Sequence, residues 1–219
     1  MSESSSSFDV NAFIKESKET LVNPKSYFSS MKISGGMAEP LIKAVIYGAV
    51  AGIIAFLWSI VGLGAMGAGF MGGAIGAMAL VWGIIGAIIG LFIGAVILLV
   101  ISSICKGNTD FEANMRVVAA TMVIMPVSAL LAFTAGLNTT LGAIIGLCVN
   151  LYGLYLLYHG LTEALKAKPD TTKIVLYVLA ALLVLFMIIG LGTKRKVNKF
   201  MDDFDTKDVK EMLKDLEED

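Results

Sequence analysis

Apolar residues dominate this chain in long uninterrupted runs, and the polar residues between the runs divide it into segments. From Ala44 to Cys105 there is no Asp, Glu, Lys, Arg or His, and the same holds from Val117 to Tyr158. A helix needs about 20 apolar residues to cross a bilayer, so each run is long enough for two crossings. The pattern predicts an integral membrane protein.

Turn-forming segments divide these runs into predicted helices. Glycines crowd the stretch from Gly62 to Gly76, which predicts a bend there, and GLNTTLG from Gly136 to Gly142 interrupts the second run. Another apolar run follows the polar segment ALKAKPDTTK. The predicted spans are Leu41–Gly62, Ala77–Ile104, Val117–Leu137, Leu141–Leu165 and Ile174–Gly192. The predicted fold class is therefore all-α, a polytopic membrane helix bundle with five transmembrane helices.

The residues before the first span predict two short amphipathic helices. In the segment from Asp9 to Val22 the apolar residues recur at helical spacing, with Lys and Glu around the other side. Pro24 is well placed to begin a second helix capped by Asn23, with Tyr27 and Phe28 on its apolar side. We expect both helices to lie on the membrane surface; a solvated helical preamble without bilayer contact is the alternative.

These features predict three parts of the chain: an N-terminal cytoplasmic amphipathic segment (1–40), a membrane domain (41–192) and a charged C-terminal tail (193–219). The N-terminus lacks a basic stretch followed by an apolar one, so no cleavable signal peptide is expected. In the tail, Asp205 to Asp219 has apolar residues at helical spacing and an acidic end. That segment could dock a partner, or be a frayed solvated helix.

Basic residues orient the predicted helices. With a cytoplasmic N-terminus, one side collects the following basic residues: Lys15, Lys18, Lys25, Lys32, Lys43, Lys106, Arg116, Lys166, Lys168 and Lys173. The two loops on the opposite side carry none, which is a positive-inside signal. The basic cluster after the fifth span contradicts this orientation, although C-terminal charges contribute less. The side occupied by the tail stays open.

Composition narrows the classes of function. The chain is 57% hydrophobic and 16% charged with a formal net charge of -1, so it has no basic field suited to nucleic acid. Membrane lipids are the expected partners, with the cytoplasmic N-terminal segment and the C-terminal tail as candidate sites for a protein partner. Cys105 and Cys148 lack the spacing of metal ligands and are expected to be apolar fillers. No cofactor, metal or catalytic group is expected.

Glycines four residues apart predict close helix packing, because small residues let neighbouring backbones approach in lipid. The predicted packing residues are Gly48, Gly52, Gly86, Gly90, Gly94, Gly142 and Gly146. These strips serve contacts within one chain or between copies in a homo-oligomer, and we favour the first. Pro126 inside the third span should kink it, because proline removes a backbone donor and clashes with the preceding turn.

Polar residues single out the fourth span. Asn150 continues a glycine strip and should bond across a helix interface, while Tyr155, His159 and Glu163 share one face near the cytoplasmic end. An interfacial anchor is favoured for these groups over a proton or substrate path. At the start of the third span, Glu112 and Arg116 are four apart and should form an ion pair.

Several of these features, in this order and spacing, resemble the Yip1 domain family in its prokaryotic branch. They are Asn23-Pro24 with Phe28, Pro40 before the first span, GNTDFEANMRVVAATMVIMP, and LYGLYLLYHGLTEALKAKP. The resemblance covers about residues 20 to 192. It implies a five-helix membrane domain with a cytoplasmic N-terminus. Eukaryotic relatives act in traffic between endoplasmic reticulum and Golgi and associate with Rab-type GTPases, but the Asp-Leu-Tyr-Gly-Pro stretch of those relatives is missing here, so GTPase binding is not carried over.

The sequence favours a non-enzymatic membrane scaffold, adaptor or membrane-organising factor. No polar path is evident through the first, second and fifth predicted spans, and amphipathic segments lie at both ends. The alternative is a small transporter or channel that uses Asn150, His159 and Glu163 with the kink at Pro126. The expected location is the prokaryotic cytoplasmic membrane, or an endomembrane in a eukaryote.

Overall fold

The computed structural model describes residues 9–63 and 70–192, and its regular elements are all helices. They are α1 (Val10–Val22), α2 (Pro24–Ser30), α3 (Ala38–Ile60), α4 (Phe70–Ile104), α5 (Phe111–Thr121), α6 (Ile124–Leu131), α7 (Phe133–Leu137), α8 (Thr139–His159) and a π-helical turn η1 (Gly160–Ala164), followed by a helix within Pro169–Gly192. Five segments are long and apolar enough to cross a membrane: Ala38–Ile60, Leu80–Ile104, Phe111–Leu137, Thr139–Ala164 and Pro169–Gly192. The predicted all-α, five-span fold class is confirmed.

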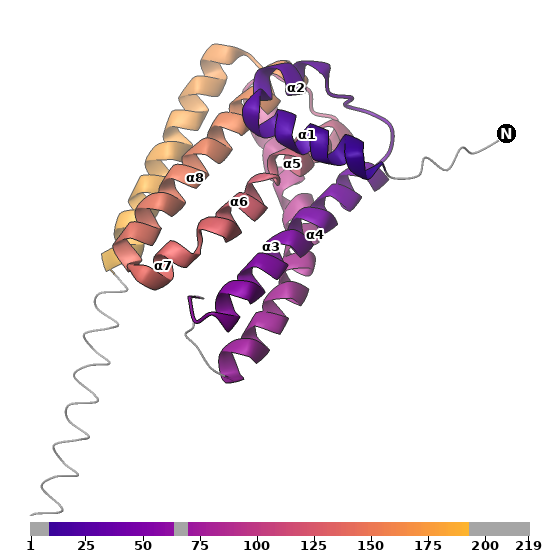
Figure 1. Cartoon of the computed structure of the whole chain (residues 1–219). Coiled ribbons are helices and arrows are strands. Elements are labelled where there is room, and N and C mark those ends of the chain that lie inside the picture. Colours follow the sequence, from indigo (N-terminus) through magenta and orange to yellow (C-terminus); the bar gives the residue numbers. More distant parts are fainter. Residues whose placement is uncertain (1–8, 64–69, 193–219) are drawn as a thin grey trace, which may run out of the picture. The chain divides into compact units, whose positions relative to one another are not determined.

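The chain divides into two units, Met1–Ala180 and Ala181–Asp219, with the division inside the last span. In the first unit, α1 and α2 lie across one end of the helices formed by α3, α5 and α8 (Figure 1). We call α1 and α2 together the cap. In the second unit, residues 181–192 are helical and carry exposed leucine, isoleucine and phenylalanine side chains. The predicted helix at Asp205–Asp219 lies outside the described residues.

Side-chain caps explain where several helices begin. Asp9 accepts hydrogen bonds from the backbone of Asn11 and Ala12, and Asp110 accepts one from Ala113. Pro24 occupies the first turn of α2, where its missing N–H costs nothing. The predicted Asn23 cap is wrong, because its side chain makes no capping hydrogen bond; its backbone N–H instead closes α1 on the Glu19 carbonyl.

The glycine-rich stretch bends over a shorter range than predicted. α3 ends at Ile60, and Gly62 has a φ of +79°, a conformation that glycine adopts without strain. The chain is helical again from Phe70, so the glycines after it belong to α4 rather than to a bend reaching Gly76. Residues 64–69 are not described.

The third span is broken where proline requires it. α5 ends at Thr121 and α6 begins at Ile124, and the interruption includes Met122, the residue four before Pro126. Proline cannot donate to that carbonyl and its ring crowds it, so Met122 accepts from Met125 instead, at 2.9 Å. A second interruption at Ala132 separates α6 from α7. Near it, the Trp58 indole donates to the Ala129 carbonyl at 3.1 Å and ties α3 to α6.

Helices α3 and α4 touch backbone to backbone through small residues. A Cβ placed on Gly48 would lie 2.6 Å from both the Gly83 carbonyl oxygen and the Ala87 Cβ, and one on Gly83 would lie 3.3 Å from the Gly52 Cα. Gly142 is equally close to Ala135, because its Cβ would lie 2.4 Å from that Cα. A Cβ on Gly94 would meet Val118 at 3.0 Å. These glycines pack within the chain.

Three other predicted packing glycines make no close contact with the described residues of the chain. A Cβ on Gly86, Gly90 or Gly146 would meet no atom of the described residues within 4 Å, so the prediction of packing within the chain is wrong for them. Each step of four residues turns about 40° further around a helix, which brings Gly94 onto the buried face but leaves Gly86 and Gly90 outside it. Gly146 lines a mostly apolar cavity of about 340 Å³ shared with α3 and α6.

Two loops interlock at the cap end of the first unit. Asn108 donates its backbone N–H to the Leu165 carbonyl at 2.7 Å, and Lys168 donates to the Cys105 carbonyl at 2.8 Å. The Ser102 hydroxyl and the Asn114 amide both donate to the Asn108 carbonyl. The loop after α4 and the loop after η1 therefore hold each other, and the second, fourth and fifth spans meet at this end.

Lys106 closes α4 in a left-handed conformation, with a φ of 59°. An L side chain in this region costs about 1 kcal/mol, so Lys106→Gly is expected to raise the free energy of unfolding by up to about 1 kcal/mol. Denaturant-induced unfolding in detergent micelles measures the change. Lys106→Ala is the control, because it removes the same charge and keeps the strain. An equal gain in both variants would assign the effect to charge instead.

Candidate functional site

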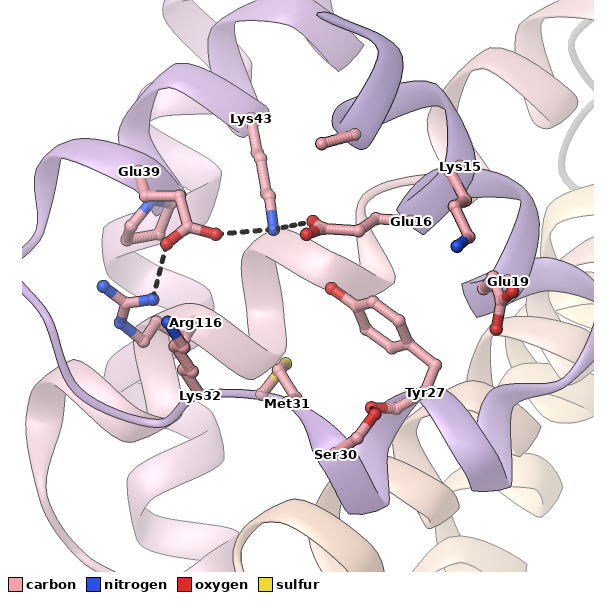
Figure 2. A pocket seen from close by; sticks show the side chains of 12 residues that line it. Lys15, Glu16, Glu19, Tyr27, Ser30, Met31, Lys32, Glu39, Lys43 and Arg116 are labelled. Atoms are coloured by element: carbon pink, nitrogen blue, oxygen red, sulfur yellow. Dashed lines mark hydrogen bonds and ion pairs between the residues drawn. The ribbon is translucent and has the colours of Figure 1, made fainter. Parts of the chain in front are cut away.

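A network of ion pairs around two buried cations joins the cap to the start of two spans (Figure 2). The Lys43 ammonium lies 2.8 Å from a Glu16 oxygen of α1 and 2.8 Å from a Glu39 oxygen of α3. The second Glu39 oxygen lies 2.8 Å from Arg116 Nη1 of α5, and Arg116 Nε lies 3.0 Å from Glu112. The Lys43 and Arg116 side chains are only 10% and 5% exposed. We call these five residues the ion-pair network.

The network also fixes the loop between α2 and α3. Arg116 Nη2 donates to the Gly36 carbonyl at 2.8 Å, and the Gly36 N–H donates to Glu112 at 2.6 Å. Gly35 and Gly36 have φ values of +134° and +94°, which favour glycine, and a Cβ on Gly35 would lie 3.1 Å from Arg116 Nη2. The loop can approach the guanidinium this closely because no side chain is present.

Beside the network lies a pocket of about 560 Å³, which we call the polar pocket. Its walls come from α1, α2, the loop after α2, α3 and α5, and they consist of Ala12, Lys15, Glu16, Glu19, Tyr27, Ser30, Met31, Lys32, Glu39, Pro40, Lys43 and Arg116. Tyr27 points its hydroxyl towards Glu16 and Lys43 (Figure 2). Burial raises the pKa of the Tyr27 hydroxyl above its ordinary value, so Tyr27 is a neutral phenol at physiological pH.

Further contacts seat the cap on the spans. The Ser17 and Tyr47 hydroxyls are 2.7 Å apart, and the Tyr152 hydroxyl of α8 donates to the Leu21 carbonyl of α1. Phe28 of α2 is completely buried, and a Cβ on Gly160 would lie 3.5 Å from its ring. The same Cβ would lie 2.5 Å from Val117. The cap therefore rests on the first, third and fourth spans.

Tyr152→Phe is expected to loosen the cap without unfolding the spans. Losing one hydrogen bond costs about 1 kcal/mol, which raises the open fraction of α1 about fivefold. Hydrogen exchange of the backbone amides of Val10–Val22 should therefore accelerate about fivefold. Tyr155→Phe is the matched control, because the Tyr155 side chain is 48% exposed and its hydroxyl has no hydrogen bond among the described residues. Equal exchange in both variants would contradict the prediction.

The structure brings together some of the residues predicted from sequence. The predicted Glu112–Arg116 ion pair is present at 3.0 Å, and it is one part of a larger network. Tyr155 and His159 are in contact, with ring centroids 4.8 Å apart, and Tyr158 lies on His159 at 5.3 Å. His159 is 8% exposed, and its Nδ1 has no hydrogen-bond partner among the described residues. Glu163, four residues on, is half-buried in η1.

One sequence interpretation of a polar side chain is wrong. Asn150 is exposed and donates to the Gly146 carbonyl of its own helix at 2.8 Å, so it does not bond across a helix interface. Its amide instead bonds to the local backbone, as polar side chains in apolar helices can.

The carboxylates of the ion-pair network pair with Lys and Arg side chains rather than forming a metal site. Within residues 9–63 and 70–192, no group of three or more His, Cys, Asp or Glu side chains is placed to hold a metal ion. Glu16, Glu39 and Glu112 each bond to Lys43 or Arg116. The chemistry of this arrangement is structural: it holds three helices together at one end of the bundle.

Five apolar spans, a broken third span and a helical cap held by buried charges define a polytopic α-helical membrane protein. The model of the Yip1 domain family matches residues 18–192, and the chain belongs to this family. The match includes α2, the end of α1 and every span. Comparisons with curated proteins and with solved structures gave no significant match.

Proposed function

We propose that this Yip1 family protein is a non-enzymatic scaffold or adaptor of the prokaryotic cytoplasmic membrane, with the cap facing the cytoplasm as a rigid platform for a protein partner. The observation that carries the proposal is the ion-pair network. It fixes α1 to the first span through Glu16 and Lys43, and Arg116 holds the loop that follows α2. The cap keeps apolar residues exposed, among them Val10 and Val22 at 58% and 75%. A fixed surface of this kind suits recruitment rather than chemistry.

The orientation has independent support from the interlocked loops. They place Lys106, Lys166 and Lys168 at the same end of the first unit as the cap, whose own basic residues are Lys15, Lys18 and Lys25. The opposite end, around Gly62 and Asn138, carries no charged side chain among the described residues. Positive charge gathers on the cytoplasmic side of membrane proteins.

Cysteine accessibility tests this orientation. In a background with Cys105→Ala and Cys148→Ala, Ser34→Cys and Asn108→Cys should react with an impermeant maleimide only after the membrane is opened. Asn138→Cys should react in intact cells. Labelling of Ser34→Cys in intact cells would place the cap outside and overturn the proposed orientation.

Site-specific photocrosslinking in native membranes tests recruitment. A crosslinking residue at Val22 or Lys25 of the cap should give a discrete protein adduct, whereas one at Ile60, at the opposite end, should not. The adduct should weaken in the Lys43→Gln background, because the cap then loses the ion pair that joins Glu16 of α1 to α3. Cap positions that crosslink only to lipid would contradict the adaptor role.

The transporter alternative has weaker support. Asn150 bonds to its own helix, and the ring contacts of His159 with Tyr155 and Tyr158 occupy its surroundings. We expect no ion or solute flux in liposomes above that of protein-free vesicles. Flux that is lost in Glu163→Gln would support the transporter and contradict the scaffold.

A further inference from the structure

The polar pocket lies at the depth where the first and third spans begin. Glu39 and Lys43 are in the first two turns of α3, and Arg116 is in the second turn of α5. A pocket at the ends of spanning helices is level with the headgroups of the lipids around them. Its other walls come from α1, α2 and the loop after α2. The charged side chains of the pocket therefore lie at the level of the lipid headgroups.

The pocket has unused hydrogen-bond donors. Lys15 and Lys32 line it from opposite elements, and neither ammonium lies within 4 Å of a carboxylate of the described residues. Lys43 uses two of its three N–H groups in the network and faces the Tyr27 hydroxyl, whereas Arg116 uses three of its five N–H groups. Glu19 is the one wall carboxylate without an ion pair among the described residues. A ligand that is negatively charged and rich in hydrogen-bond acceptors fits these unused donors best.

We infer that the polar pocket binds the phosphate of an anionic phospholipid headgroup, held between Lys15 and Lys32. The remaining N–H groups of Arg116 form the inner wall, and the acyl chains enter the surrounding bilayer. Phosphate oxygens accept several charge-assisted hydrogen bonds at once, which is what two free ammonium groups and an arginine supply. A water-soluble phosphate would use the same donors but gain nothing from acyl chains buried in the bilayer.

The proposal is tested on the full chain in detergent by native mass spectrometry with three probes: phosphatidylglycerol, phosphatidylcholine and inorganic phosphate. Wild type should retain one phosphatidylglycerol more tightly than phosphatidylcholine, by at least tenfold in apparent affinity. Lys15→Gln with Lys32→Gln should lose that preference. Lys18→Gln with Lys25→Gln is the matched control, because it removes the same charge from α1 and α2 at exposed positions outside the pocket. The control should stay within about twofold of wild type.

Each outcome either supports or overturns anionic lipid binding in the polar pocket. Equal losses in the two double variants would mean a diffuse electrostatic effect and overturn the pocket. Equal retention of phosphatidylcholine, or inorganic phosphate competing as well as lipid, would overturn the anionic lipid. A circular dichroism spectrum and unfolding midpoint like wild type show that each variant is folded. The proposal stands apart from recruitment by the cap, since lipid retention and crosslinking to a partner are separate measurements and either can fail alone.

Discussion

Arg116→Met is expected to destabilise the protein by about 2 kcal/mol, because it removes three charge-assisted hydrogen bonds and leaves Glu39 and Glu112 without their shared cation. The Glu39 and Glu112 side chains are 46% and 23% exposed, so water solvates part of each remaining carboxylate and the loss stays below that of a fully buried pair. Arg116 is 5% exposed and holds two carboxylates and the Gly36 carbonyl. Denaturant-induced unfolding in detergent micelles, followed by circular dichroism, gives the free energy.

The matched control for this prediction is Lys173→Met. Lys173 lies 3.9 Å from Asp170 in an ion pair whose carboxylate is 99% exposed, and such pairs contribute little. We expect a change below about 0.5 kcal/mol. A loss below 1 kcal/mol in Arg116→Met, or equal losses in the two variants, would show that the ion-pair network does not stabilise the fold.

Gly48→Val is expected to have an effect at least as large, about 3 kcal/mol or more, because it separates α3 from α4. The Cβ alone would lie 2.6 Å from the Gly83 carbonyl oxygen, and a backbone atom cannot move aside as a side chain end can. In lipid there is no compensating hydrophobic force to keep the two helices together. The measurement is the same unfolding experiment, and Gly48→Ala gives a milder variant that should still lose stability if Gly48→Val does not fold.

Gly86→Val provides the matched control on the facing helix. No described atom lies within 4 Å of a Cβ there, so the same added volume meets open space. We expect a change below about 0.5 kcal/mol. If Gly86→Val destabilises as much as Gly48→Val, close approach between these helices is not what holds them together.

The spans could be predicted from the sequence because the hydropathy signal is summed over some twenty residues. Such a sum does not locate the ends of a span or single contacts, and the errors fall there. The ion pair of Glu112 with Arg116 was predictable because both lie on one helix, four residues apart. The pairs of Lys43 with Glu16 and of Arg116 with Glu39 join different helices, and no local spacing indicates which helices will be neighbours. The most informative available signal was Lys43 itself, a charge at the start of a span with carboxylates nearby in sequence.

The glycines show the same limit on one helix. Spacing by four predicts a strip of small residues, but which side of α4 faces α3 depends on Gly83 and Ala87, which continue a different strip. Gly94 reaches the buried side of α4, where it faces Val118 of α5. Asn150 was misplaced for a related reason, because periodicity gives the face of a helix and not what covers that face.

The residues that hold the cap come from distant parts of the chain, and this constrains the order in which the protein assembles. Glu16 and Leu21 are synthesised before the first span, but their partners include Lys43, and Tyr152 in the fourth span, while the cation that completes the network is Arg116 in the third. A ribosome delivers these groups in order, so the N-terminal helices cannot make all of these contacts until the fourth span has entered the bilayer. Complete docking of the cap is thus a late step of assembly. In a nascent chain halted before Tyr152, α1 should be more accessible to protease.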